Sequence, residues 1–176
     1  MNHYRCFAYT LFLLVTCFAK STASEPTKYD GPMLEGTQLE IIRSDEGVVT
    51  ISILTDKFLQ YQNGDIMYPE GIYGTFYDTD KSISAILSAN TVYYYAEKDV
   101  YELKGDVEIK SYKGKKQLNT EELHWNIGTE EVYTDKFVRV ETEEALLTGK
   151  GLTARQDLSH YSLLVPQGFV SVEAAE

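Results

Sequence analysis

Alternation of apolar and polar residues dominates the chain from Leu39 onward. It runs through Val48–Leu54, Asp106–Tyr112 and Lys136–Thr142. A period of two residues is typical of β-strands that bury one face. Short joints rich in Gly, Asn and Asp separate the runs, and these residues tolerate the backbone angles of tight turns. Because no stripe with a 3.6-residue period follows the first two dozen residues, the pattern predicts an all-β, antiparallel domain.

The same arrangement of residues recurs along the chain at an interval of about 31 positions. The segment Leu87–Ile109 aligns with Leu118–Val140, a third copy starts at Leu147, and a looser first copy covers Leu54–Phe76. The copies share apolar positions and differ at charged ones. About four β repeats of ~30 residues therefore predict one continuous repeated sheet.

Within each copy the apolar positions skip a residue. Strict alternation from Leu87 would select Thr91 and Tyr93, whereas the copies share Val92 and Tyr94. An inserted residue is the signature of a β-bulge, which bends a strand and increases its twist. A bulge in every copy predicts a curved sheet whose apolar concave face forms a trough.

Residues 1–23 have the features of a targeting segment. An uncharged stretch of 14 residues, Cys6–Ala19, follows Arg5, and a membrane span needs about 20. Three fates stay open for it: lipoprotein processing with acylation of Cys17, signal-peptide cleavage after Ala23, or retention as a short anchor. Each sends the chain across the inner membrane. Residues 24–38 are expected to be a tether, and residues 39–176 a single domain.

Charge and cysteine content exclude several classes of function. The formal net charge of −11 argues against nucleic-acid binding and against electrostatic adhesion to anionic lipid. Both cysteines, Cys6 and Cys17, lie in the leader. The domain therefore has no disulfide, no thiolate nucleophile and no cysteine-ligated metal.

Glu121, Glu122 and His124 form the stretch that most resembles an active site. Adjacent strand residues point to opposite faces, and the other copies carry different residues at these places. His124 and His160 lack the spacing of metal ligands. No catalytic residue, metal site or cofactor is predicted. An enzyme acting on surface glycans through acids such as Glu121 or Asp135 is kept as a third hypothesis.

Two long phrases are similar to a known family. "LNTEELHWNIGTEEVYTDKFVRV", residues 118–140, and "GKGLTARQDLSHY", residues 149–161, resemble the periplasmic LptC-type proteins of lipopolysaccharide export. The version seen in Bacteroidetes-like bacteria, within the OstA/LptA-like β-jellyroll superfamily, is the most similar. The resemblance covers about residues 39–172. It implies a single twisted half jelly-roll, an open V-shaped antiparallel β-sandwich with an apolar interior.

The resemblance also implies a function. Such a protein receives lipopolysaccharide from an inner-membrane ABC transporter and passes it toward the outer membrane, while the transporter hydrolyses ATP. Open sheet edges invite strand addition from other chains. The first strand, near Leu39–Leu54, is expected to meet the transporter's periplasmic domain, and the last, near Phe169–Val172, the next bridge protein. We expect the protein in the periplasm, attached to the inner membrane or soluble there.

The acyl chains of the lipid would lie in the trough, where each buried CH₂ contributes about 0.8 kcal/mol. An edge-joining structural module with a filled core and no lipid ligand is the alternative. The candidates for lining the trough are the recurrent apolar positions: Ile53, Leu87, Val92, Val107, Ile109, Leu118, Leu123, Trp125, Val138, Val140, Leu147 and Leu152.

Overall fold

A computed structural model describes residues 29–171, with side chains to residue 168. The lipidation candidate Cys17 and the cleavage position Ala23 lie outside these residues. Gly31 onward forms a compact unit of its own, and no helix within 29–171 is long and apolar enough to span a membrane. The strands are β1 (Leu34–Asp45), β2 (Val48–Gln60), β3 (Ile66–Tyr68), β4 (Ile72–Tyr77), β5 (Ile83–Ala89), β6 (Thr91–Tyr95), β7 (Val100–Ser111), β8 (Lys116–Asn126), β9 (Glu131–Glu141), β10 (Ala145–Arg155) and β11 (Tyr161–Ser171).

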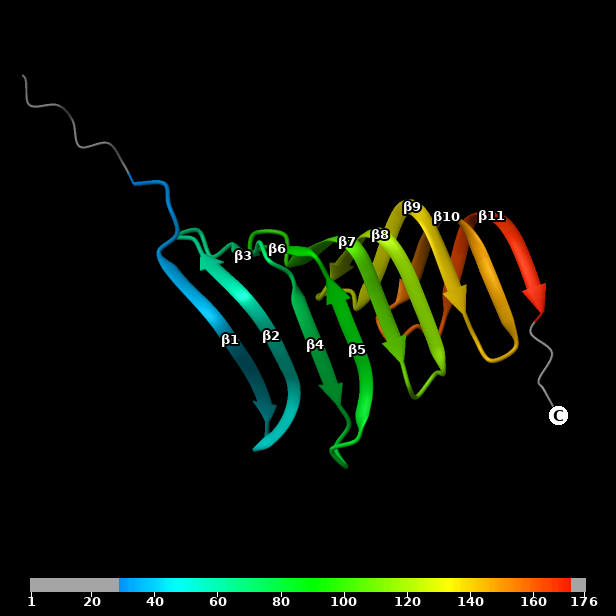
Figure 1. The fold of residues 1–176 in the computed structure, drawn as a ribbon, viewed down its shortest axis with the longest axis horizontal. Helices are drawn as coiled ribbons and strands as arrows, with labels where there is room; N and C mark the ends of the chain where they lie inside the picture. The colour runs from blue at the N-terminus through cyan, green and yellow to red at the C-terminus, as the bar shows by residue number, and fades with distance from the viewer. Residues whose placement is uncertain (1–28, 172–176) are drawn as a thin grey trace, which may run out of the picture. The chain divides into compact units, whose positions relative to one another are not determined.

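All eleven strands belong to one antiparallel sheet, which confirms the all-β prediction. β1 pairs only with β2 at one edge, and β11 pairs only with β10 at the other (Figure 1). Between them β2, β7, β8, β9 and β10 are long strands that bend over their length. Short strands share the remaining places: β4 and β3 both pair with β2, and β5 and β6 both pair with β7.

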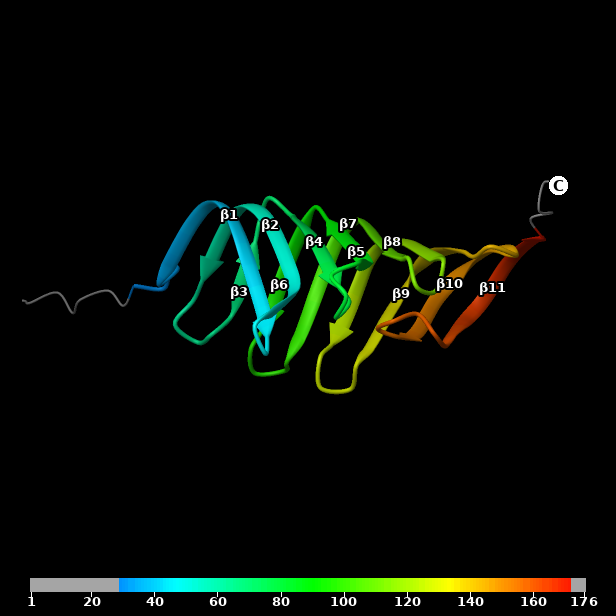
Figure 2. The same ribbon diagram turned by 90° about the horizontal axis from the view of Figure 1, so that it is seen from below.

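The sheet therefore has two leaves, which the long strands connect. Leaf A holds β4 and β5 together with the halves of the long strands that continue their side of the sheet. Leaf B holds β3 and β6 together with the other halves of the long strands. β7 pairs with β6 over residues 100–104 and with β5 over residues 108–111, so it crosses from leaf B to leaf A. The same change of leaf repeats along β8 to β11, and Figure 2 shows the bent strands side by side.

The bends lie where the sequence skips a residue. The β7–β8 register shifts between Lys104 and Val107, and the β8–β9 register shifts between Thr120 and His124. In the copy before, Asn90 interrupts the strand and separates β5 from β6. This agrees with the bulges predicted from the repeat. Each copy is a bent hairpin, for example β8 and β9 for residues 118–140.

The amino-terminal edge differs from the prediction in two ways. The tether was expected to end at residue 38, but β1 starts at Leu34, so residues 34–38 are strand. The expected single strand over Leu39–Leu54 is a hairpin of β1 and β2, with Asp45 opposite Val48. The turn residues Glu46 and Gly47 both have positive φ, +49° and +83°, as the tight two-residue hairpin turn requires.

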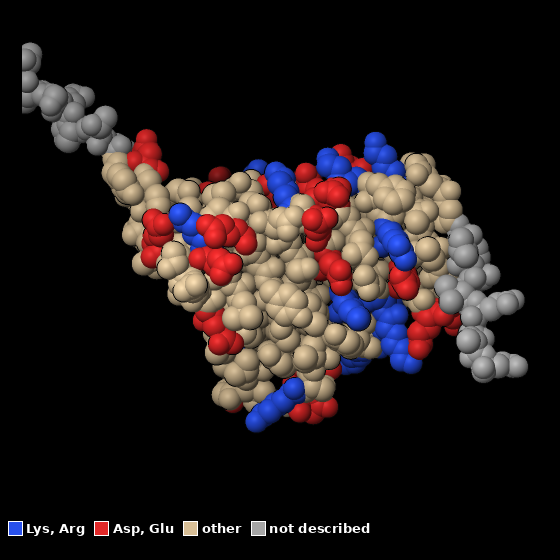
Figure 3. Space-filling view, in the orientation of Figure 1, with Lys and Arg blue, Asp and Glu red and all other residues tan. Residues whose placement is uncertain are grey.

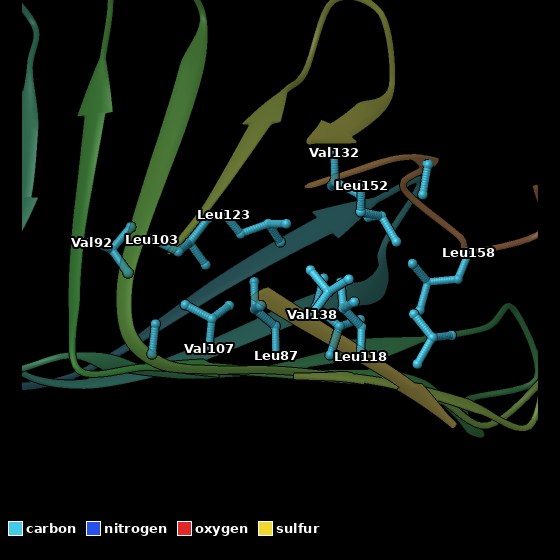
Figure 4. Packing of buried hydrophobic residues seen from close by; sticks show 14 of the residues in the cluster. Leu87, Val92, Leu103, Val107, Leu118, Leu123, Val132, Val138, Leu152 and Leu158 are labelled. Atoms are coloured by element: carbon cyan, nitrogen blue, oxygen red, sulfur yellow. The ribbon is translucent and has the colours of Figure 1, made fainter. Parts of the chain in front are cut away.

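The core lies between the leaves. In Figure 4, Leu103, Leu123 and Leu152 of leaf B point toward Leu87 and Val138 of leaf A. Leu118, Leu123, Val92 and Val138 have no exposed surface. The interior of the described domain is thus filled by its own side chains from β5 to β10.

Candidate functional site

A continuous row of apolar residues crosses the inner face of leaf A. Residues directly opposite in antiparallel strands share one face of the sheet. The register therefore connects β1 to β10 without a polar interruption, and Leu147 at its end pairs with Phe169 of β11. The row is Ile41, Ile53, Gly74, Leu87, Ile109, Leu118, Val140 and Leu147.

Leaf B carries a second inner row, and this one is rich in aromatic residues. Tyr94 lies opposite Tyr101, which lies opposite Trp125. Their rings are 4.6 Å apart for Tyr94 and Tyr101 and 5.6 Å for Tyr101 and Trp125. The row continues through Val132 and Ala154 to Tyr161 in β11. The neighbouring tyrosines 93 and 95 lie on the opposite face of the strand.

The structure brings eleven of the twelve predicted trough residues into one cluster. Nine of them are buried members of the core: Leu87, Val92, Val107, Ile109, Leu118, Leu123, Val138, Val140 and Leu152. Trp125 and Leu147 pack against this core and are partly exposed, and Ile53 is half-buried near the β1 edge. That these residues contact lipid stays a prediction.

Two sets of contacts join the leaves at the ends of their strands. Phe76 of leaf A meets Trp125 of leaf B edge to face, with ring centroids 6.3 Å apart. Lys116 of leaf A reaches the turn between β10 and β11, where its Nζ donates to the carbonyls of Leu158 at 2.9 Å and Ser159 at 3.4 Å. The same ammonium lies 5.4 Å from the centre of the Tyr161 ring. We call these Lys116 contacts the clasp.

The apolar interior also affects its tyrosines. Burial raises the pKa of Tyr68 to about 12, and it raises the pKa of Tyr101 as well. Removing a phenolate from water disfavours the charged form. Both hydroxyls therefore stay neutral to a higher pH than an exposed tyrosine does.

The two free edges differ in chemistry. β1 carries Glu35, Glu40 and Asp45, all exposed, whereas β11 contains no charged residue. Leu164 and Val165 of β11 are 65% and 55% exposed. An uncharged, apolar edge is an accessible template for another strand, whereas charged side chains line the β1 edge, which also carries Arg43.

The outer face of leaf B holds a cluster that sequence reasoning missed. Ligand atoms of Glu102, Glu122 and His124 lie within 4.8 Å of one another. The carboxylates already face lysines: Lys104 is 2.9 Å from Glu102, and Lys136 is 3.7 Å from Glu122. The spacing of Glu122 and His124 predicts that they lie on the same face of one strand. Glu102 could not be added from the sequence, because the β7–β8 register places it beside them. The arrangement is a partly buried network in which lysines neutralise the carboxylates, with Lys136 also 3.0 Å from Asp135.

Comparison with known proteins gives one family. The family model described as "Lipopolysaccharide-assembly, LptC-related" matches residues 6–165. No curated protein matches the chain.

Proposed function

The chain belongs to the LptC-related family of lipopolysaccharide assembly, which matches residues 6–165, and from this premise we propose that it is a bridge that conducts lipopolysaccharide through its apolar interior. The family is a periplasmic, inner-membrane-associated part of lipopolysaccharide transport, so the protein takes part in that transport. It receives the lipid from the ABC transporter at the β1 edge and passes it on at the β11 edge. The family is not known for catalysis.

One observation carries this proposal: the apolar row of leaf A reaches from β1 to the last hairpin. A plain core needs apolar residues only at its centre, whereas a conduit needs them at both edges, where the next protein continues the path. Ile41 and Ile53 supply the row at the β1 end. The lipid's acyl chains lie along this row while its charged sugars stay in water.

The filled core sets a condition on this mechanism. Leu118 and Leu123 are fully buried, so a chain can touch them only after the leaves separate. Separation breaks the clasp and the contact between Phe76 and Trp125. Near the β1 edge the interior is less covered, because Ile41, Ile53 and Phe58 are only partly buried. The lipid therefore enters from that side and separates the leaves as it moves.

Photo-crosslinking in cells tests the proposal. A photoreactive residue is placed at Ile53 or Leu123 on the inner face, with Leu54 and Glu122 as the adjacent outward controls. We expect lipopolysaccharide adducts at both inner positions and none at the controls. The Leu123 adduct should depend on ATP hydrolysis by the transporter, because the transporter supplies the lipid that enters between the leaves.

The edge-joining module is the second candidate, and the fully buried residues of the core favour it. It predicts no adduct at Ile53 or Leu123 in a folded, membrane-associated protein. An adduct at Ile53 alone would limit the lipid to the β1 end and would refute passage through the whole domain.

A further inference from the structure

A groove lies on the surface beside the β1 edge, and its floor includes Ala89 of the core and Ile72, which packs against the core. Strand pairing is interrupted there, because β2 pairs with β4 up to Leu54 and with β3 only from Leu59. The Thr55 hydroxyl donates to the carbonyl of Gly71 at 2.8 Å and holds the β3–β4 turn against β2. The groove is lined by Gln38, Leu39, Glu40, Leu54, Thr55, Asp56, Glu70, Gly71, Ile72, Tyr73, Ala89 and Asn90.

Acidic side chains surround this groove. Glu40, Asp56 and Glu70 are exposed, and among the described residues none of the three forms an ion pair. No lysine or arginine lines the groove. Other carboxylates of the domain do have a basic partner, as Glu102 has in Lys104 and Glu35 has in Lys57. The groove therefore has a local negative charge without a counter-charge from its own chain.

Apolar side chains lie between these acids. Leu54 and Tyr73 are 49% and 46% exposed, which is high for residues of adjacent paired strands. They lie side by side, because Leu54 pairs with Tyr73 across β2 and β4. Such a surface is complementary to a segment in which a cationic side chain stands next to an apolar one: the acids attract the cation, and the exposed apolar pair packs against its neighbour.

The whole β1 end of the domain has the same charge bias. From Leu34 to Tyr95 the chain has nine acidic and three basic residues, and from Val100 to Ser171 it has twelve and nine. Figure 3 shows the acidic side chains that gather at the end holding β1 and β2. A partner that approaches this end meets a negative field, which speeds the encounter of a basic surface and repels an acidic one.

We propose that this acidic groove binds a cationic segment of the inner-membrane partner, with Glu40, Asp56 and Glu70 contacting its basic side chains and Leu54 and Tyr73 its apolar ones. The inference rests on the proposed function, because that function places the transporter at the β1 edge. It adds a second contact to strand addition. Strand addition depends mainly on main-chain hydrogen bonds and therefore tolerates many sequences. The charged groove would supply the specificity for one partner.

The test uses the full chain co-expressed with the lipopolysaccharide-export ABC transporter of its own cell and purified as a complex. One variant carries Glu40→Gln, Asp56→Asn and Glu70→Gln. A matched control carries Glu97→Gln, Glu121→Gln and Glu131→Gln, which removes three exposed, unpaired acids elsewhere. Co-elution with the transporter is measured at about 50 mM and about 300 mM NaCl, since salt screens charge–charge attraction.

We expect the groove variant to lower co-elution at low salt by about fivefold or more and to lose the salt dependence of the unaltered chain. The control variant should keep both. Equal behaviour of the two variants would overturn the groove proposal, while co-elution of the unaltered chain would leave the proposed function intact. Absence of co-elution of the unaltered chain would refute both. Loss of co-elution with EDTA, to the level of the groove variant, would show a divalent cation in the groove and overturn the cationic segment.

Discussion

Replacing Lys116 by Met should open the clasp and leave the rest of the domain in place. Methionine keeps most of the apolar stem and removes the charge. The ammonium donates to Leu158 at 2.9 Å in a partly buried contact, and a hydrogen bond from a charged group contributes about 1.5–3 kcal/mol. The longer bond to Ser159, at 3.4 Å, is exposed and adds little. We therefore expect the turn between β10 and β11 to open more easily by about 2 kcal/mol.

Hydrogen–deuterium exchange measures this opening. A loss of about 2 kcal/mol corresponds to an approximately 30-fold faster exchange of the amides that close the turn. One such amide is that of Leu158, which donates a hydrogen bond to the backbone carbonyl of Arg155. Lys115→Met is the matched control, because Lys115 makes an exposed ion pair with Glu143 that contributes close to nothing. Equal exchange in the two variants, or an unchanged turn in Lys116→Met, would refute the clasp.

The remaining predictions concern stability. Leu123→Ala should lower the free energy of unfolding by about 2–5 kcal/mol in urea titrations, because its fully buried side chain leaves a cavity. Gly71→Ala should cost about 2–3 kcal/mol or more, because its φ is +81° and an added Cβ would clash with the backbone oxygen of Ala89. Gly47→Ala is the comparison: its φ is +83° but the space around it is open, so it should cost about 1 kcal/mol. Tyr68 has a pKa raised from 10.0 to about 12, so its stabilisation is complete below pH 10 and is lost as the pH rises from about 10 to 12. Tyr68→Phe should reduce that loss, as measured by unfolding at pH 9 and about 11.5; an unchanged slope would contradict the assignment.

The bends could be predicted because they change the period of the sequence. A skip between Ala89 and Val92, repeated at Thr120 and Leu123, is visible without a structure, and it marks the places where β5 gives way to β6 and where the β8–β9 register shifts. The β1–β2 hairpin was missed for the opposite reason. Its turn at Glu46 and Gly47 keeps the alternation on both sides nearly in phase, so the apolar pattern alone does not distinguish the hairpin from one long strand.

The composition of the interior could be predicted, but its closure could not. The twelve apolar positions recur with the repeat, so their shared face follows from the pattern. Lys116 and Leu158 are 42 residues apart and belong to no recurrent position. Their contact depends on how far the leaves fold toward each other, which depends on the angle at every bend. The cluster of Glu102, Glu122 and His124 likewise depends on the β7–β8 register.

A filled interior is compatible with a conduit because an entering acyl chain takes the place of the apolar neighbours that it pushes aside. When the leaves separate, each apolar side chain exchanges an apolar neighbour for an acyl chain, so its burial is retained. The contacts without a substitute are those between the strand ends: the Lys116 bond, about 1.5–3 kcal/mol, and the edge-to-face pair of Phe76 and Trp125, about 0.5–1.5 kcal/mol. A chain of about a dozen carbons gains about 10 kcal/mol on burial at 0.8 kcal/mol per CH₂. Relative to exposure of the chain in water, this gain exceeds the cost, so an acyl chain that would otherwise be exposed can itself open the domain. Without a bound lipid, the closed leaves keep a large apolar surface out of water, where it would otherwise favour aggregation. The same gain is available to a chain moving either way, so in the proposed function the direction comes from the supply of lipid at the β1 edge by a transporter that hydrolyses ATP.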